Sequence, residues 1–242
     1  MTSPLLAVQH LGKRFGGLVA LQDVSFDVTE GETLGVMGAN GAGKTTLFSL
    51  IAGNARPTSG RIEYQGQRID GLSPDRVCRL GIARTFQIVK PFADLSVIEN
   101  AMVGGFHGTR DEALARRRAE DALRALGMWA LRDRLAASLT LPDRKRLEVA
   151  RALATQPRLL LLDEVMAGLR PTETDEMVAV FRRLNAEHGI TILLIEHVMR
   201  AVMALAQRVY VLHHGEVIAE GTPAQVTSDP RVLESYLGAE AF

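Results

Sequence analysis

The sequence predicts an α/β protein with a mostly parallel sheet, an N-terminal antiparallel β subdomain and an inserted helical subdomain. An early stretch alternates in polarity, with Val24, Phe26 and Val28 on one face, as half-buried strands do. Residues 158–163 and 190–195 are almost continuously apolar, which is typical of parallel strands covered by helices on both faces. Between the N-terminal stretch and these apolar runs, the composition becomes rich in alanine and arginine, with apolar residues at helical spacing.

The elements before and within the insertion follow from local patterns. Residues 33–37 are predicted to form a short strand that ends in a glycine-rich turn, and residues 45–52 the helix after it. Residues 112–126 and 143–155 are predicted helices, and Gly127 stands where a C-cap glycine belongs. The insertion therefore consists mainly of helices.

After the insertion the α/β alternation returns. Residues 177–187 and 198–206 are predicted helices, and a hairpin is predicted around His213-His214. These two histidines have no carboxylate or cysteine companion in their turn, so we interpret them as surface residues. The prediction divides the chain into an α/β core, residues 1–87 and 146–242, and a helical subdomain, residues 88–145.

Bulk properties exclude several classes of protein. Basic and acidic residues balance at 28 each, which gives no indication of a nucleic-acid partner. The apolar runs are strand-sized, far below the roughly 20 residues of a membrane span, and the N-terminus lacks the pattern of a secretion signal. The single cysteine, Cys78, excludes an intrachain disulfide. We expect a soluble cytoplasmic protein.

A phosphate-binding loop is predicted between the strand 33–37 and the helix 45–52. Its residues match the pattern G-x-x-x-x-G-K-[ST], which defines a P-loop NTPase core. Glycines let the backbone amides approach phosphate oxygens, and the helix N-terminus attracts the same anion. Lys44 would contact the β- and γ-phosphates, and the Thr45 hydroxyl would ligate Mg²⁺. The predicted ATP ligands in this loop are Gly38, Ala39, Asn40, Gly41, Ala42, Gly43, Lys44, Thr45 and Thr46.

Two carboxylates follow the leucine-rich strand. Asp163 and Glu164 stand at its carboxyl end, where open α/β sheets bind ligands. Asp163 suits the Mg²⁺ shell, and Glu164 suits the base that orients the attacking water.

Together these motifs resemble the ABC-type ATPases over essentially the whole chain. More closely, the chain is similar to ATPase subunits of branched-chain (hydrophobic) amino-acid importers. That finer resemblance is carried by FGGLVAL at 15–21, GIARTFQ at 81–87, LSVIEN at 95–100, AGL at 167–169 and IEHVM at 195–199.

The resemblance implies roles for further residues. Phe15 would stack on the adenine. Gln87 would touch Mg²⁺ and the attacking water, and would relay the nucleotide state to the membrane partner. His197 would contact the γ-phosphate, so the implied catalytic residues are Glu164, His197 and Gln87, and the metal ligands Thr45, Gln87 and Asp163.

One segment departs from the family. The signature is normally Ser-Gly-Gly-Gln at the start of a helix, and it contacts the γ-phosphate of the opposite subunit; here residues 140–143 read TLPD. Thr140 keeps a hydroxyl and, with Asp143, is a predicted nucleotide contact. However, Pro142 removes an N–H donor and Asp143 places a carboxylate near an anion. Either of the two basic residues that follow would compensate.

A second departure lies after the acidic pair, where Val165-Met166 and Arg170 replace the usual residues. We therefore predict normal ATP binding, with hydrolysis that depends on which partner completes each site.

The function implied is that of an ATP- and Mg²⁺-dependent ATPase that drives an importer, of branched-chain or related amino acids, from the inner face of the cell membrane. Its partners would be membrane permease subunits, a second ATPase subunit and, indirectly, a substrate-binding protein, with no nucleic acid. Homodimer and heterodimer remain open. The alternatives are a non-transport ABC-type ATPase and a subunit that hydrolyses ATP only weakly. A P-loop GTPase is disfavoured because no Asn-Lys-x-Asp segment occurs.

Overall fold

The structure is a computed structural model that describes residues 3–87 and 89–237. Its N-terminal part is an antiparallel sheet of four strands in the order β2-β1-β4-β5. Val24, Phe26 and Val28 are buried on one face of β2, as the alternation predicts. The strands are β1 (Leu6–Phe15), β2 (Leu18–Val28), β4 (Ser59–Tyr64) and β5 (Gln67–Arg68).

The second sheet has six strands in the order β10-β9-β3-β8-β7-β6. All of its neighbouring pairs are parallel except β9 with β10, which form the predicted hairpin. The strands are β3 (Thr33–Met37), β6 (Ile82–Arg84), β7 (Leu159–Asp163), β8 (Thr191–Ile195), β9 (Arg208–His213) and β10 (Glu216–Gly221).

Two hydrophobic cores lie on opposite faces of this sheet. In β7, Leu160 and Leu162 pack into the core on the helical side, whereas Leu159 and Leu161 pack into the core shared with the antiparallel sheet. Because successive side chains of a strand point to opposite faces, a strand between two cores must be apolar throughout. This explains the unbroken leucine run.

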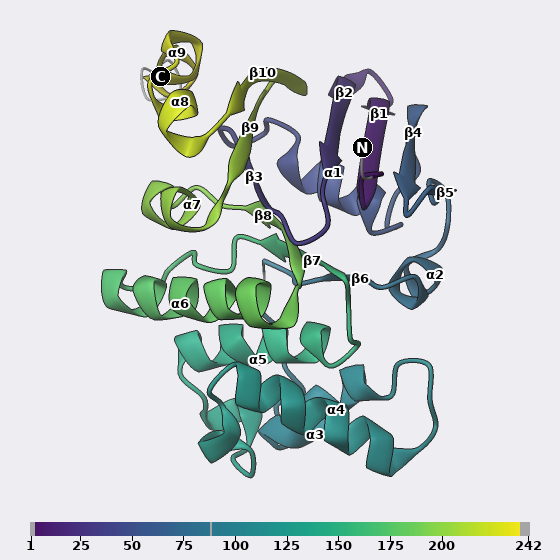
Figure 1. The fold of residues 1–242 in the computed structure, drawn as a ribbon, viewed down its shortest axis with the longest axis vertical. Helices are drawn as coiled ribbons and strands as arrows, with labels where there is room; N and C mark the ends of the chain where they lie inside the picture. Colours follow the sequence, from purple (N-terminus) through teal and green to yellow (C-terminus); the bar gives the residue numbers. More distant parts are fainter. Residues whose placement is uncertain (1–2, 88, 238–242) are drawn as a thin grey trace.

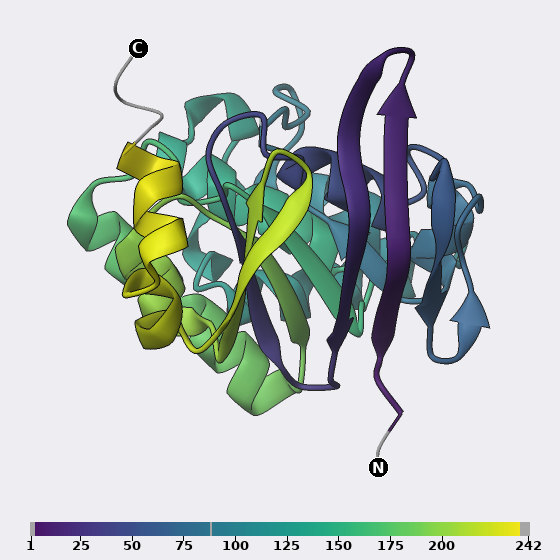
Figure 2. The ribbon, with the colours of Figure 1, turned by 90° about the horizontal axis from the view of Figure 1, so that it is seen from above.

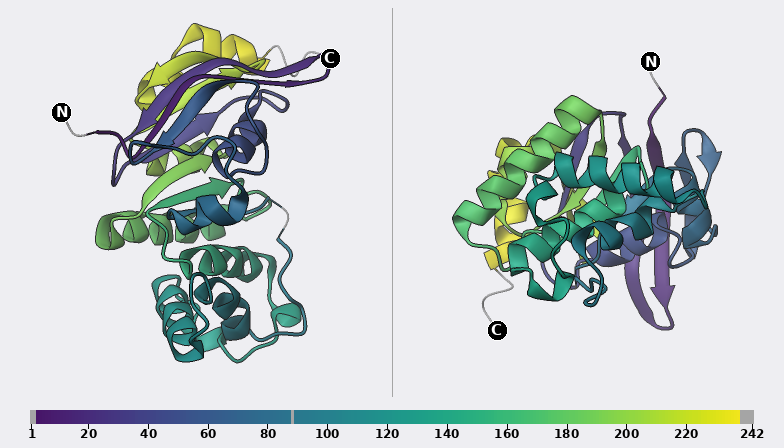
Figure 3. Two further views of the ribbon diagram at one scale, coloured as in Figure 1. Left: turned by 90° about the vertical axis from the view of Figure 1, so that its right-hand side faces the viewer. Right: turned by 90° about the horizontal axis from the view of Figure 1, so that it is seen from below.

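The helices form layers around the sheets. They are α1 (Lys44–Ile51), α2 (Pro74–Arg79), α3 (Val97–Gly105), α4 (Glu112–Ala125), α5 (Leu141–Leu153), α6 (Pro171–His188), α7 (Met199–Leu205), α8 (Pro223–Thr227) and α9 (Pro230–Leu237), with 3₁₀ turns at Trp129–Leu131 and Ala136–Ser138. Helices α3, α4 and α5 form a layer on the side of the parallel sheet away from the antiparallel sheet (Figures 1 and 3), with α5 packed into the core that β7 shares. Helices α8 and α9 lie beside the β9–β10 hairpin. In Figure 2 the β1–β2 hairpin runs alongside β9–β10, and Gln22 N donates to Gly215 O at 2.8 Å between them.

The fold class predicted from the sequence is confirmed, and one helix boundary is wrong by more than two residues. The apolar pattern predicts a helix from residue 177, whereas α6 begins at Pro171. Proline at the first helical position needs no N–H partner, and Glu173 Oε2 accepts from Arg170 N at 2.8 Å to cap the turn. The polar residues 172–176 carry no apolar periodicity, so their helical turn is hidden in the sequence.

We propose that the division into a core and a helical subdomain follows the boundaries given above. The boundary residue 88 lies outside the described residues, and the boundary at 145–146 falls inside α5. Helices α3 and α4 of the helical layer are closely packed. A Cβ atom at Gly105 of α3 would collide with the carbonyl oxygen of Ala115 in α4, so only glycine permits this approach. Among the described residues, no helix combines the length and apolar character that crossing a bilayer requires.

Burial predicts that truncation of a core leucine costs more stability than truncation of an exposed one. Leu161 is fully buried in β7, whereas Leu233 on α9 is 49% exposed. We expect Leu161→Ala to lower the free energy of unfolding by about 2–5 kcal/mol, and Leu233→Ala to change it by less than about 0.5 kcal/mol. Urea denaturation of both variants measures the difference, and similar losses would contradict the assignment of Leu161 to the core.

Candidate functional site

The carboxyl edge of the parallel sheet gathers the predicted ligands of the core. The P-loop follows β3, Gln87 follows β6, Asp163 ends β7 and His197 follows β8. Parallel strands end at the same edge of a sheet, and ligands of open α/β sheets bind there. Residues that are distant in the sequence therefore meet at one site.

The P-loop requires glycine at its first and last glycine positions. Gly38 has a φ of 147° and Gly43 a φ of 105°, a backbone region that L side chains rarely adopt. A Cβ at Gly38 would collide with the Leu212 carbonyl oxygen, and one at Gly43 would lie 2.5 Å from the Ala20 carbonyl oxygen. The loop is thus held between β9 and β2. The other predicted ligands of the loop are Ala39, Asn40, Gly41 and Ala42, and α1 begins with Lys44, Thr45 and Thr46.

The N-terminus of α1 is suited to an anion. No side chain caps its first turn, and that turn contains no acidic residue. Its backbone N–H groups and its positive dipole end therefore favour phosphate at this position.

Lys44 adds a buried positive charge to this end of the helix. It is 6% exposed, and its Nζ donates to Gly38 O at 2.7 Å and to Ala39 O at 2.9 Å. Burial lowers the pKa of Lys44, while the carboxylates of Glu164 and Asp163 oppose that shift. The cation is therefore held at the loop, with acidic groups close enough to stabilise its charged form.

Asp163 is paired with an arginine that the sequence analysis did not single out. Arg84 Nη2 donates to Asp163 Oδ2 at 2.7 Å, and the two side chains are only 9% and 2% exposed. Arg84 Nη1 also donates to Ser49 Oγ at 3.1 Å, and the Ser49 hydroxyl donates to Thr45 O at 2.8 Å. These bonds connect the end of β7 with the first turn of α1.

The residues around Asp163 fit a magnesium ion. Arg84 occupies Asp163 Oδ2, while the buried Oδ1 has no hydrogen-bond partner in the described part of the chain. Thr45, Gln87 and Asp163 line one cavity of about 480 Å³. Mg²⁺ prefers such oxygen ligands, and it is usually bound by one or two carboxylates together with waters and substrate phosphates.

The three predicted catalytic residues meet at one carboxylate. Glu164 Oε2 accepts from Gln87 Nε2 at 2.5 Å and lies 3.9 Å from His197 Nδ1. Glu164 has a φ of 49°, which is uncommon for a residue other than glycine, and its N donates to Ile195 O at 2.9 Å. An unusual backbone conformation thus directs this carboxylate toward Gln87 and His197.

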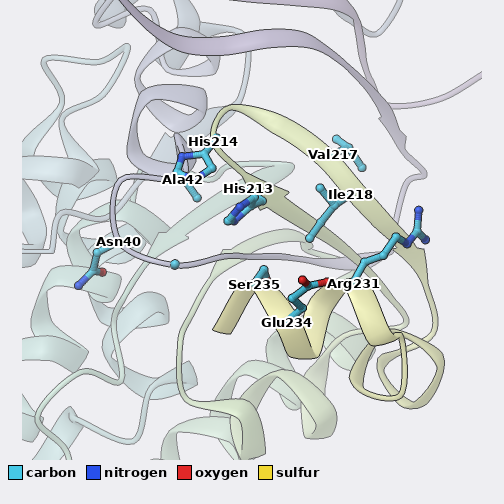
Figure 4. Close-up of a pocket in the computed structure, with 10 residues that line it drawn as sticks. Asn40, Ala42, His213, His214, Val217, Ile218, Arg231, Glu234 and Ser235 are labelled. Atoms are coloured by element: carbon cyan, nitrogen blue, oxygen red, sulfur yellow. The ribbon is translucent and has the colours of Figure 1, made fainter. Parts of the chain in front are cut away.

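A larger cavity, of about 730 Å³, borders the P-loop at Asn40 and Ala42. Its other walls come from the β9–β10 hairpin and α9, and in Figure 4 Asn40 and Arg231 lie at opposite ends with His213 between them. The described residues that line it do not include Thr45 or Asp163, so this space is distinct from the predicted metal site.

Phe15 lies at the tip of the β1–β2 hairpin and is 51% exposed. Its ring centroid is 4.7 Å from Lys13 Nζ, and it pairs with Leu18 across the hairpin. Ala20, whose carbonyl oxygen faces Gly43, is two residues beyond Leu18, or about 7 Å along the strand. An exposed aromatic ring therefore lies near the P-loop end of the hairpin.

The two predicted nucleotide contacts of the signature segment are bonded to each other. Thr140 is the N-cap of α5, and its Oγ1 donates to Asp143 Oδ2 at 2.7 Å. The basic residues expected to compensate are engaged elsewhere. Arg144 Nη2 donates to Ala137 O at 2.9 Å, and Lys145 Nζ to Glu164 O at 3.3 Å. The first turn of α5 therefore presents a carboxylate, and both cations that follow it bind backbone carbonyls of their own chain.

Sequence reasoning missed Arg84 and Glu196, and it considered Lys145 only as a cation that would compensate Asp143. Arg84, Lys145 and Glu196 are all nearly buried. Glu196 Oε1 accepts from Met166 N at 2.8 Å, and burial raises the pKa of Glu196 to about 7. Two of them, Arg84 and Glu196, stand at or just after the end of an apolar strand, and that position is a signal that could have identified them.

Comparison with known proteins gives the class of protein. A family model described as "ABC transporter" matches residues 21–167, and one described as "Branched-chain amino acid ATP-binding cassette transporter" matches residues 216–241. The chain therefore belongs to the ABC transporter family, as an ATP-binding and ATP-hydrolysing subunit.

Individual relatives cover nearly the whole chain. LivG of Salmonella typhimurium, a high-affinity branched-chain amino acid transport ATP-binding protein, is 41% identical over 98% of this chain and 99% of its own length. BraF of Pseudomonas aeruginosa, with the same description, is 38% identical over the same shares. The solved ADP conformation of MJ1267, an ATP-binding cassette of an ABC transporter, has a TM-score of 0.89 and 31% identity, covering 98% of this chain and 100% of that one.

The buried ion pair of Arg84 predicts a large effect on stability. Arg84→Met leaves the Asp163 carboxylate buried without its partner, so we expect the free energy of unfolding to fall by about 3–5 kcal/mol. A matched control is Arg200→Met, which breaks an exposed ion pair with Asp175, the two side chains being 64% and 49% exposed. We expect this variant to lose less than about 1 kcal/mol of unfolding free energy. Urea denaturation measures both variants. Equal losses of unfolding free energy would show that the buried pair contributes no more to stability than the exposed pair.

Proposed function

We propose that this chain binds Mg-ATP at the P-loop and powers import of branched-chain or related amino acids by hydrolysing it. The observation that carries the proposal is the meeting of Gln87, Glu164 and His197 beside Lys44 and Asp163 at one edge of the sheet. The similarity to LivG and BraF over nearly the whole chain supports the substrate class.

In this proposal each residue has a defined task. Glu164 orients a water molecule and accepts its proton, because its carboxylate is the acceptor that Gln87 and His197 approach. His197 donates to the γ-phosphate, and Lys44 with the amides of the loop stabilises the phosphate charge. The adenine stacks on the exposed ring of Phe15.

Thr45, Gln87 and Asp163 are the proposed magnesium ligands. A bound Mg²⁺ would neutralise charge on the β- and γ-phosphates. Arg84 holds Asp163 Oδ2, whereas Oδ1 bonds to no other residue that the structure describes and is available to the ion.

The proposed membrane partner binds the groove beside Gln87. Phe86, Phe92 and Val103 are large apolar residues with 53%, 47% and 44% exposure, and a cavity of about 240 Å³ opens between Phe86 and Val103. Exposed apolar side chains around a groove mark protein contacts. A permease bound here would place the chain at the inner face of the membrane.

The chemistry is tested by replacing the proposed base. Glu164→Gln keeps the shape of the side chain but removes its basicity, so we expect ATP turnover to fall by about 10²–10⁴-fold with ATP affinity retained. Removal of Mg²⁺ with EDTA should abolish turnover of the unaltered chain. Lys44→Ala should weaken ATP binding itself, measured by fluorescence of a labelled nucleotide.

A matched control for the base is Glu187→Gln, since Glu187 is an exposed carboxylate on α6. Its turnover should equal that of the unaltered chain. If Glu164→Gln still hydrolysed ATP at the control rate, the assignment of the base would be wrong.

The signature segment predicts dependence on the second ATPase subunit. We expect the purified chain alone to turn over more slowly than its mixture with a partner ATPase, because Pro142 and Asp143 weaken phosphate contact in the homodimer. Pro142→Gly combined with Asp143→Gln should raise the rate of the chain alone. Asp133→Asn, which removes a carboxylate that is 77% exposed, is the control. A fast homodimer, or no gain in the double variant, would contradict this prediction.

A further inference from the structure

Lys145 links the helical layer to the catalytic carboxylate. It lies on α5, which is between α3–α4 and the parallel sheet (Figure 1), and it is only 4% exposed. Its Nζ donates to the backbone oxygen of Glu164 at 3.3 Å. A long cationic side chain buried to this extent needs partners that repay its loss of hydration.

The backbone of Glu164 is held from two directions. On one side its N donates to Ile195 O at 2.9 Å. On the other its carbonyl accepts from Ala167 N at 3.2 Å within the following turn, and from Lys145 Nζ, which comes from the helical layer. Its φ of 49° is a conformation that persists only where the surroundings over-determine it. The rotamers open to a side chain depend on its backbone angles, so these backbone bonds also influence where the carboxylate points.

A second buried charge stands near Lys145. Glu196 is fully buried, its Oε1 accepts from Met166 N, and its Oε2 has no partner within the described ranges. Burial lowers the pKa of Lys145, and the carboxylates of Glu196 and Glu164 oppose that shift. Lys145 thus has two roles that can be separated. It compensates the charge of Glu196, and it holds the backbone of Glu164.

We propose that Lys145 is a positioning residue that reaches from the helical layer to fix the backbone of Glu164 for catalysis. The proposal rests on the role of Glu164 as the base. It implies that the position of α5 against β7 determines whether the Glu164 carboxylate meets Gln87 and His197. A shift of the helical layer would therefore change the rate of hydrolysis without touching the nucleotide.

The first test compares binding with turnover in the full-length chain assembled with its membrane and ATPase partners. Lys145→Met should lower kcat by about 10–100-fold, the usual cost of a displacement near 1 Å in a catalytic group. The KM for ATP should stay unchanged, because the P-loop is not altered. Lys145→Arg keeps a cationic donor and should recover most of the lost kcat.

The second test separates positioning from charge compensation. Lys145→Met should lower Tm by several degrees, and adding Glu196→Gln should restore Tm because the uncompensated carboxylate is removed. If Lys145 positions Glu164, kcat stays low in the Lys145→Met/Glu196→Gln variant. Recovery of kcat together with Tm would show a structural role only, and would overturn the proposal.

Arg118→Met is the matched control. Arg118 is a half-buried cation of the same helical layer that donates to Gly105 O at 3.2 Å and to His107 O at 2.7 Å. Its loss should lower Tm but leave kcat per folded molecule unchanged. Activity of Glu164→Gln in the same assay would contradict the proposed base itself. Loss of activity in Glu164→Gln together with a normal kcat in Lys145→Met would contradict only the role of Lys145.

Discussion

Burial of the parallel sheet on both faces decides where polar groups can stand in this protein. Strands β3, β7 and β8 are buried at every residue, so their interior positions must be apolar. Charged and phosphate-binding groups are left with the strand ends. At the carboxyl ends they gather beside the N-terminus of α1, whose dipole favours an anion. The P-loop and the acidic pair are therefore consequences of one packing arrangement.

The site also depends on buried charges that compensate one another. Lys44, Arg84 and Lys145 are cations within it, and Asp163 and Glu196 are carboxylates with almost no exposure. An isolated charge in such surroundings is strongly disfavoured, whereas paired and hydrogen-bonded charges are tolerated. In the part of the chain that the structure describes, Asp163 is paired through Oδ2 alone, so its Oδ1 remains an acceptor for a ligand. The charge balance thus supports stability and prepares a binding position.

The helical layer contributes more than a surface for partners. Helix α5 begins with the altered signature segment and, one turn later, extends Lys145 into the core. One helix therefore joins the face that would meet a second ATPase to the backbone of Glu164. The departure from the family pattern and the internal contact lie about one turn apart, so a change at the outer face has a short path to the carboxylate that we propose as the base.

The sequence by itself determined the P-loop, the strands around it, the fold class and the family, because each is encoded in contiguous residues or in a local apolar pattern. It also predicted Gln87, Glu164 and His197, through resemblance, and the structure brings their side chains together, while their roles remain proposals. Local patterns did not reveal the start of α6, whose first turn is polar. Only the tertiary structure decided the pairing of Arg84 with Asp163 and of Lys145 with Glu164. Such contacts depend on the spatial order of the strands and on how α5 docks, and no local sequence pattern specifies either.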